Sequence, residues 1–270
     1  MMQTQNEFSQ NSEFSISSLT PAIWKMIASS VQTLSEDATF EVDADGVRTR
    51  AMDPSHVAML DVKFPSNAFE KFRCLKPTKF TVHVEDFSKI VKRSESKETF
   101  EISRSETKSL SVKIGSGHYR KEFELHLLDD ELKSSPLPKL TFTTRFAMGL
   151  DTFFQILTDI SAISSHVSVA VSKTGSVILS GKGDSGKAEI TLGKGDGALL
   201  QEIELENVSE ETRAVYNLEY LIKIVKSVSA FSDFVRFEYS TKMPLRLEFQ
   251  SLERKSAAPV QFYLAPKMID

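Results

Sequence analysis

The sequence FSKIVK at Phe87–Lys92 returns as LIKIVK at Leu221–Lys226, an offset of 221 − 87 = 134 residues. Upstream, FEVDADG at Phe40–Gly46 resembles VAVSKTG at Val169–Gly175, an offset of 175 − 46 = 129, and each continues to a valine and another strand-like run. Similar offsets at two separate places indicate an internal repeat. We therefore predict two copies of one unit of about 130 residues, each ordered helix, strands, helix, strands.

Short alternating runs rich in β-branched and aromatic residues dominate the chain and predict strands. They predict an α+β fold made mainly of antiparallel sheet. The runs are Thr39–Val42, Val57–Phe64, Lys79–Val82, Phe100–Ser103, Ser109–Ile114, Glu122–Leu127, Val167–Val171, Ser176–Leu179, Ala188–Leu192, Phe234–Tyr239, Leu245–Phe249 and Val260–Leu264.

Four amphipathic stretches predict helices: Pro21–Leu34, Val84–Ser94, Gly149–Ile163 and Leu218–Ala230. In the first, Thr20 is the expected N-cap and proline takes the first helical position. Its expected buried face consists of Ile23, Ile27, Val31 and Leu34, which recur at helical spacing.

Composition sets limits on the function. The chain has 270 residues, 40% hydrophobic and 26% charged, which is typical of a folded globular protein. The net charge of −4, from 33 basic and 37 acidic residues, excludes coating of nucleic acid by bulk positive charge, so any DNA contact must be local or topological. There is no apolar run of about 18 residues, and the polar start Met1–Glu13 lacks the apolar core of a signal peptide, which predicts an intracellular protein.

No motif in the sequence predicts catalysis, a metal site or a cofactor. The loop Gly181–Lys187 resembles a phosphate-binding loop, but Ala188 stands where the Ser or Thr should be and a strand follows, so a hairpin turn is expected. The single cysteine, Cys74, is expected to be a packing residue. The histidines show no metal-ligand spacing: they are His56, His83, His118, His126 and His166.

The basic residues follow the repeat. At 100° per residue, Lys89, Lys92 and Arg93 fall on the side of the second helix opposite its apolar residues, and Lys223 and Lys226 do the same in the fourth. Lysines on an exposed helix face are common, but their recurrence at equivalent positions in an acidic chain indicates a shared cationic surface.

Two motifs near opposite ends of the chain carry a family resemblance. The sequence DGVRTRAMDPSHVAM at Asp45–Met59 and FYLAPK at Phe262–Lys267 closely resembles the sliding clamps of the proliferating cell nuclear antigen type, found in archaea and eukaryotes. The resemblance runs in order from about Phe14 to Asp270 and includes both lysine-bearing helices.

The resemblance implies a fold and an assembly. Three chains would lie head to tail in a closed ring of six domains, with helices lining the hole, antiparallel sheets outside and strands pairing across subunit edges. The edges would be about 118–127 and 185–192. The expected segments are a disordered N-terminal extension at 1–13, an N-terminal clamp domain at 14–127, a connecting loop at 128–141 and a C-terminal clamp domain at 142–270.

The resemblance also implies a function: a non-enzymatic DNA polymerase processivity factor and scaffold for replication and repair, in the nucleoid or cytoplasm of an archaeon or the nucleus of a eukaryote. It would hold duplex DNA without reading its sequence and bind polymerase, clamp loader, ligase and flap nuclease through short peptides. The DNA-facing residues would be Lys25, Lys89, Lys92, Arg93, Lys223 and Lys226. The partner pocket would comprise Met52, His56, Val57, Met59, Leu137, Pro138, Phe142, Pro244, Ala265 and Pro266.

The sequence departs from the family pattern in places. Ser135 and Pro136 replace a leucine and a glycine often seen there, which bears on pocket depth and partner preference. Lys173 matches a lysine modified in eukaryotic members, but a plain turn residue is expected. The third helix has no basic residue on its polar face, which carries Gln155, Thr158, Asp159 and Ala162.

Other interpretations stay open at this stage. A monomeric β-rich peptide-binding adaptor and a specialised checkpoint-type clamp subunit are the alternatives, and an enzyme with an unrecognised site is disfavoured. The sequence distinguishes neither a homotrimer from a heterotrimer nor one partner enzyme from another.

Overall fold

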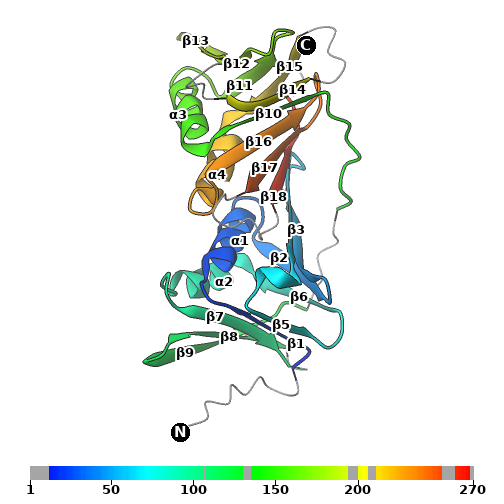
Figure 1. The fold of residues 1–270 in the computed structure, drawn as a ribbon, viewed down its shortest axis with the longest axis vertical. Helices are drawn as coiled ribbons and strands as arrows, with labels where there is room; N and C mark the ends of the chain where they lie inside the picture. The colour runs from blue at the N-terminus through cyan, green and yellow to red at the C-terminus, as the bar shows by residue number, and fades with distance from the viewer. Residues whose placement is uncertain are drawn as a thin grey trace. The chain divides into compact units, whose positions relative to one another are not determined.

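The structure is a computed structural model that describes residues 12–105, 108–129, 135–193, 200–205, 211–250 and 259–267 (Figure 1). It divides into two compact units. The first consists mainly of residues before 135 and the second mainly of later ones, but the second also includes Ala51–Asp61. The stretch that carries the DPSH motif therefore folds with the C-terminal half of the chain.

The four predicted helices are confirmed. They are α1 (Ala22–Gln32), α2 (Val84–Lys92), α3 (Leu150–Ser161) and α4 (Leu218–Val228). The prediction of Thr20 as the N-cap of α1 was wrong: Pro21 takes that position, with φ −77° and ψ 2°, and no side chain caps the helix. In α4, by contrast, the Asn217 side chain accepts hydrogen bonds from the first-turn N–H groups of Glu219 and Tyr220.

In the first unit a five-stranded antiparallel sheet has the order β5-β1-β7-β8-β9. Its strands are β1 (Phe14–Ser18), β5 (Lys71–Cys74), β7 (Thr99–Arg104), β8 (Ser109–Ser116) and β9 (Tyr119–His126). A second set has the order β3-β2-β6, formed by β2 (Asp37–Asp43), β3 (Gly46–Met52) and β6 (Thr78–His83), and β4 (Ala58–Pro65) leads to the 3₁₀ turn Ser66–Ala68.

The second unit repeats this plan. A four-stranded antiparallel sheet has the order β13-β12-β11-β15, formed by β11 (His166–Val171), β12 (Val177–Gly183), β13 (Gly186–Leu192) and β15 (Thr212–Asn217). The other sheet has the order β14-β10-β16-β17-β18 and continues to the Ala58–Asp61 part of β4. Its strands are β10 (Thr144–Gly149), β14 (Leu200–Leu205), β16 (Phe234–Tyr239), β17 (Leu245–Gln250) and β18 (Val260–Leu264).

Every strand-like run of the sequence overlaps an observed strand, but β1, β5, β10, β14 and β15 were missed. Both repeated turns contain a glycine with positive φ, Gly46 at 149° and Gly175 at 84°. The Gly181–Lys187 loop is the predicted hairpin, in which Gly183 pairs with Gly186 across β12 and β13.

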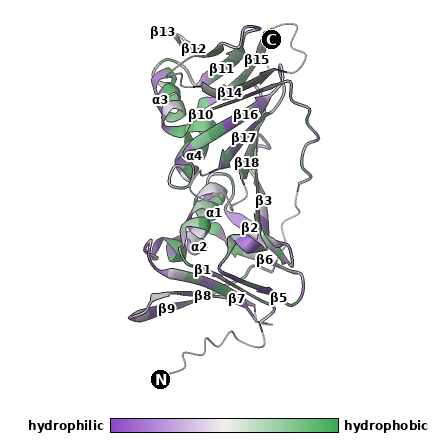
Figure 2. Cartoon of the chain, viewed as in Figure 1, coloured by the Kyte–Doolittle hydropathy of each residue, from purple (hydrophilic) through white to green (hydrophobic). Residues whose placement is uncertain are grey.

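Each unit packs a pair of helices against sheet. Helices α1 and α2 contact each other in the first unit, and α3 and α4 do so in the second. In the first core the ring centroid of Trp24 lies 6.3 Å from that of Phe87 in α2; in the second, Phe153 of α3 lies 4.7 Å from Phe237. Figure 2 shows the matching hydropathy, with long hydrophobic stretches in β10 and β16 and a largely hydrophilic β9.

The start of the described chain belongs to the first unit. Ser12 is buried, and Glu13 donates its N–H to the Arg104 carbonyl oxygen and binds the Lys76 ammonium at 2.7 Å. Residues 1–11 of the extension predicted to be disordered lie outside the described residues. Among those described, no helix is long and apolar enough to cross a membrane.

Candidate nucleic-acid interface and partner site

Helix α2 separates its apolar and cationic residues onto opposite sides. Val84, Phe87 and Val91 are buried, whereas Lys89 and Lys92 are exposed. Arg93, at the C-cap, is also exposed. The helix begins with two acidic residues and ends with basic ones, the arrangement that the helix dipole favours.

Helix α4 repeats this separation. Its buried residues include Leu221, Ile224 and Val225, and Lys223 and Lys226 are exposed. The Lys226 ammonium lies 5.8 Å from the ring centroid of Phe154, a cation–π contact with α3. Each copy of the repeat thus has exposed lysines on its second helix, which is α2 in the first copy and α4 in the second.

Two of these lysines are already in ion pairs on their own helix. Lys89 Nζ lies 2.8 Å from Glu85 Oε1, and Lys223 Nζ lies 2.6 Å from Glu219 Oε1. Exposed pairs at this spacing are weak and screened by salt. The hydrogen bond that Lys89 donates to the Glu85 carboxylate raises the pKa of Lys89, so its ammonium stays charged at neutral pH and can exchange the carboxylate for a phosphate.

Lys25 is placed differently from the other predicted DNA-facing residues. It is half-buried, and its Nζ donates to the Ser94 carbonyl oxygen at 2.6 Å, while Lys121 Nζ donates to the Arg93 carbonyl oxygen at 2.9 Å. Both ammonium groups therefore satisfy carbonyls at the C-terminal end of α2, where the helix dipole favours positive charge. Lys25 stabilises the end of α2 and keeps two N–H donors for other ligands.

The third helix carries the polar face expected from the sequence. Gln155, Thr158, Asp159 and Ala162 are all exposed, and Gln155 Nε2 donates to Asp159 Oδ1 at 2.9 Å. Among the four helices, the exposed cationic residues therefore lie on α2 and α4.

The predicted partner site centres on the turn after β3, which is organised by a buried carboxylate. Asp53 accepts hydrogen bonds from the backbone N–H groups of Ser55 (3.0 Å), Val57 (2.7 Å) and Ala58 (2.5 Å), and from the Tyr220 hydroxyl of α4 at 2.7 Å. This network holds His56 in the left-handed region, with φ 58°, and leaves its side chain exposed.

The same network shifts two pKa values. Burial opposes ionisation of Asp53, but the bonds from Ala58, Tyr220, Ser55 and Val57 outweigh it and lower the pKa of the carboxyl. The bond to Asp53, with a smaller effect of burial, raises the pKa of Tyr220 to about 12. The carboxylate and the neutral phenol are thus the stable forms at physiological pH.

Several predicted pocket residues are brought together around this turn. The Ala265 N–H donates to the Val57 carbonyl oxygen at 2.8 Å, so the segment after β18 lies beside the turn. Ser135 of the connecting loop lies with its Oγ 3.7 Å from Met52 Sδ. Of the remaining predicted members, Leu137, Pro244 and Pro266 are half-buried and Pro138 is exposed.

Met59 and Phe142 are buried, so neither presents an open wall in this region. The Arg246 guanidinium lies 4.9 Å from the Phe142 ring centroid. It also pairs with the buried Glu238, which Arg145 binds from the other side at 3.0 Å. The ion pairs of Glu238 hold the Arg246 guanidinium against the Phe142 ring.

Sequence reasoning missed Asp53, Tyr220 and Glu238. The DPSH run is a signal for a turn held by an aspartate side chain, and could have identified Asp53. Nothing in the sequence signals Tyr220 as its partner, because the two residues are 167 positions apart. No group of three or more His, Cys, Asp or Glu positioned to hold a metal occurs among the residues described.

Two family models match the chain: the N-terminal domain of proliferating cell nuclear antigen over residues 14–133 and its C-terminal domain over residues 136–267. The DNA polymerase sliding clamp of Nitrosopumilus maritimus is 37% identical over 244 residues, 90% of this chain and 94% of the relative. That of Cenarchaeum symbiosum is 36% identical with the same coverage.

Solved structures are similar as well. Proliferating cellular nuclear antigen from Entamoeba histolytica matches with a TM-score of 0.84 at 25% identity, covering 95% of this chain and all of the other. The homologue from Thermococcus kodakaraensis has a TM-score of 0.85 at 20% identity, covering 94% of this chain and 100% of the other, and supports the fold.

The Asp53 network gives a testable pH dependence. Its folded-state pKa lies below the unfolded value of about 3.9, so the stability it contributes is complete above that value and is lost as the pH falls through the folded pKa. Asp53→Asn should cost about 2 kcal/mol at neutral pH, because the amide cannot accept all the donors. The difference in the free energy of unfolding between the variant and the wild type should shrink below about pH 4. Urea unfolding at a fixed chain concentration measures it.

Asp45→Asn is the matched control, because Asp45 is exposed in the β2–β3 turn. It should change the free energy of unfolding by less than about 0.5 kcal/mol at either pH. A pH-independent loss in Asp53→Asn would contradict the assignment.

Proposed function

Because the chain belongs to the proliferating cell nuclear antigen family and is a non-catalytic DNA polymerase sliding clamp, we propose that three copies close into a ring around duplex DNA. The ring would tether DNA polymerase and other replication and repair enzymes to the DNA, in the compartment that holds the genome. The observation that carries the proposal is the recurrence of exposed lysines on α2 and α4 in both copies of the repeat.

These lysines suit a clamp that slides. Lys92 and Lys226 are exposed on the surfaces of their helices. An ammonium group in such a position can contact phosphate without reading the edges of the bases. Contacts to phosphate are sequence-independent and salt-screened, so each is weak and readily exchanged. Retention on DNA would come from ring closure, which is compatible with a net charge of −4. Lys25, Lys89, Arg93 and Lys223 would add to this surface.

The ring proposal rests on two open sheet edges. Strand β9 ends the five-stranded sheet and β13 ends the four-stranded sheet, at the positions expected from the family resemblance. Each carries a half-buried apolar side chain, Phe123 and Ile190. Pairing of β9 on one copy with β13 on the next would be head to tail, and three such contacts would close.

The partner site would bind short helical peptides of polymerase, clamp loader, ligase and flap nuclease. The turn at Asp53, the segment at Ala265 and the connecting loop at Leu137 supply its walls in this proposal. Methionine and proline side chains suit a surface that accepts several peptides. The segment assignment of the sequence, with a connecting loop at 128–141 between two clamp domains, is part of the same proposal.

Removing Lys92 and Lys226 should weaken binding to a blunt-ended DNA duplex and flatten its salt dependence. Neither forms an ion pair within the described residues. If each contacts one phosphate, the slope of log K against log salt for the double alanine variant should fall by about 0.9 per lost contact. Fluorescence anisotropy across a salt series measures both quantities.

Lys63→Ala with Lys97→Ala is the matched control, because both are exposed lysines of the first unit outside its helices. The control should leave the salt slope unchanged. Equal slopes for the two double variants would rule out α2 and α4 as the DNA-contacting surface.

Light scattering coupled to size exclusion should give a mass near three times 30.2 kDa at micromolar concentration. Phe123→Asp and Ile190→Asp should each lower that mass, because a carboxylate at the interface would lose its hydration. Lys113→Asp, on the inner strand β8, should not. A monomeric wild type would favour the adaptor interpretation or a requirement for other subunits.

Leu137→Ala should weaken binding of a peptide that carries an aliphatic residue and an aromatic pair by about tenfold, because we expect Leu137 to be one of the few anchor residues whose truncation costs more than about 1 kcal/mol. Isothermal titration calorimetry measures the change. Leu19→Ala truncates an exposed leucine of the first unit and should have no effect. Unchanged affinity in Leu137→Ala would exclude the connecting loop from the site.

A further inference from the structure

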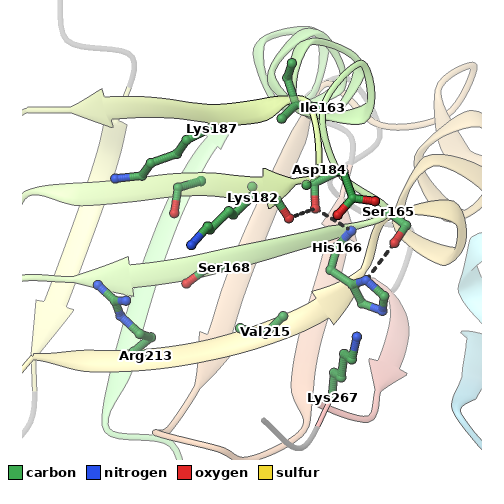
Figure 3. Close-up of a pocket in the computed structure, with 14 residues that line it drawn as sticks. Ile163, Ser165, His166, Ser168, Lys182, Asp184, Lys187, Arg213, Val215 and Lys267 are labelled. Carbon is green, nitrogen blue, oxygen red and sulfur yellow. Dashed lines mark hydrogen bonds between the residues drawn. The ribbon is translucent and has the colours of Figure 1, made fainter.

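The four-stranded sheet of the second unit carries a cavity of about 880 Å³ that the clamp function does not use. It lies on the sheet face that Figure 3 shows, where side chains of β11, β12 and β15 project beside the hairpin and the segment after β18. Its lining includes Ser168, Lys182, Lys187, Arg213 and Lys267. We call this set of residues and the space between them the sheet cavity.

The sheet cavity is strongly cationic in an acidic chain. Four basic side chains line it, and Asp184 is the single carboxylate among its lining residues. All four are exposed. Two have carboxylate neighbours at the rim, since Lys187 lies 2.5 Å from Glu189 and Arg213 lies 2.8 Å from Glu211. Such exposed pairs are weak enough to be exchanged for a ligand carboxylate.

The polar groups between the cations also suit an anionic ligand. Ser168 and Ser180 face each other across β11 and β12, and the buried Ser168 Oγ has no hydrogen-bond partner among the described residues. A buried hydroxyl without a partner is uncommon and marks a place where a ligand or water can bond. At the other end of the sheet cavity the His166 imidazole lies beside Lys267 (Figure 3). Burial, and then the charge of Lys267, lower the pKa of His166.

The face is separate from the DNA-contacting helices. Along β11 the residues Val167 and Val169 are buried, whereas Ser168 between them lies in the sheet cavity. A Cβ on Gly181 would lie 2.5 Å from Ile160 of α3, so the opposite face of β12 packs directly on that helix. Duplex DNA that contacts α4 therefore lies on the other side of this sheet. Strand pairing at the β13 edge runs in the plane of the sheet and leaves the face open.

The cations come from different elements. Lys182 belongs to β12, Lys187 to β13, Arg213 to β15 and Lys267 to the segment after β18. Their separation favours several carboxylates presented along one chain over a single phosphate. Because the DNA side of the sheet is elsewhere, a protein segment is favoured over nucleic acid. We propose that the sheet cavity is a second docking site, which binds an acidic, Asp- or Glu-rich segment of a partner protein.

The test uses the full chain and a fluorescein-labelled peptide of alternating Glu and Ser, followed by anisotropy. The wild type should bind it saturably, and a peptide of alternating Lys and Ser should not bind. The double variant Lys182→Glu with Lys267→Glu should lower the affinity for the Glu-Ser peptide by about tenfold or more, because attraction at two positions becomes repulsion. Lys182→Gln with Lys267→Gln, which removes charge without adding any, should give a smaller loss in the same direction.

The matched control is Lys63→Glu with Lys97→Glu, which changes the net charge equally on the first unit and should leave the affinity within about twofold. Circular dichroism and scattering mass establish that each variant folds and assembles as the wild type does. Equal weakening by both glutamate pairs, absent saturation, or binding of the Lys-Ser peptide would overturn the proposal. A single-stranded oligonucleotide that loses affinity only in the cavity variants would assign the site to nucleic acid instead.

Discussion

The structure depends on the burial of one face of each sheet beneath a pair of helices. In the second unit, Val167, Val169 and Leu179 meet α3 and α4 across a face so close that β12 has room only for glycine at position 181. This burial turns the polar sides of the helices outward and leaves the opposite sheet face to solvent. The helix surface, the sheet edges and the sheet cavity are three consequences of one packing arrangement.

Electrostatics then divides these surfaces. The chain is acidic overall, yet α2, α4 and the sheet cavity each present exposed basic side chains. At the C-terminal end of α2, Lys25 and Lys121 donate hydrogen bonds to backbone carbonyls, so their first role is to stabilise the fold. The exposed lysines in the last turns of α2 and α4, above all Lys92 and Lys226, are the ones available to an external anion.

Much of the fold could be predicted from the sequence, because periodicity and repetition are local signals. The helix at Val84 and its copy at Leu218 were identified from apolar spacing, and the repeat gave the order of elements. Strand β1 was missed because it is short and rich in serine, and β10 because Thr144–Gly149 does not alternate polar and apolar residues. The pairing partners of both strands lie far away in the chain. Thr20 was mistaken for the N-cap of α1 because Pro21 takes that position, and no side chain caps the helix.

The site was less predictable than the fold. The basic helix residues follow from the helical wheel, but the partner residues came from family resemblance, and the contacts that organise them are long-range. Asp53 and Tyr220 are far apart in sequence. The ion pairs of Glu238 with Arg145 and Arg246 join residues of three strands. The sheet cavity has no motif at all, since its cations are scattered from Lys182 to Lys267 and only the strand order brings them onto one face.

The bonds that Asp53 makes to its own turn and to Tyr220 have a consequence for recognition. In the proposed partner site they would fix the turn in one shape before a peptide docks, and docking would then avoid the loss of backbone entropy that a loose loop would suffer. A preorganised receptor of this kind presents the same contour to every ligand. In that proposal, differences in affinity among peptides would arise in the peptides themselves, in how readily each adopts its bound helix.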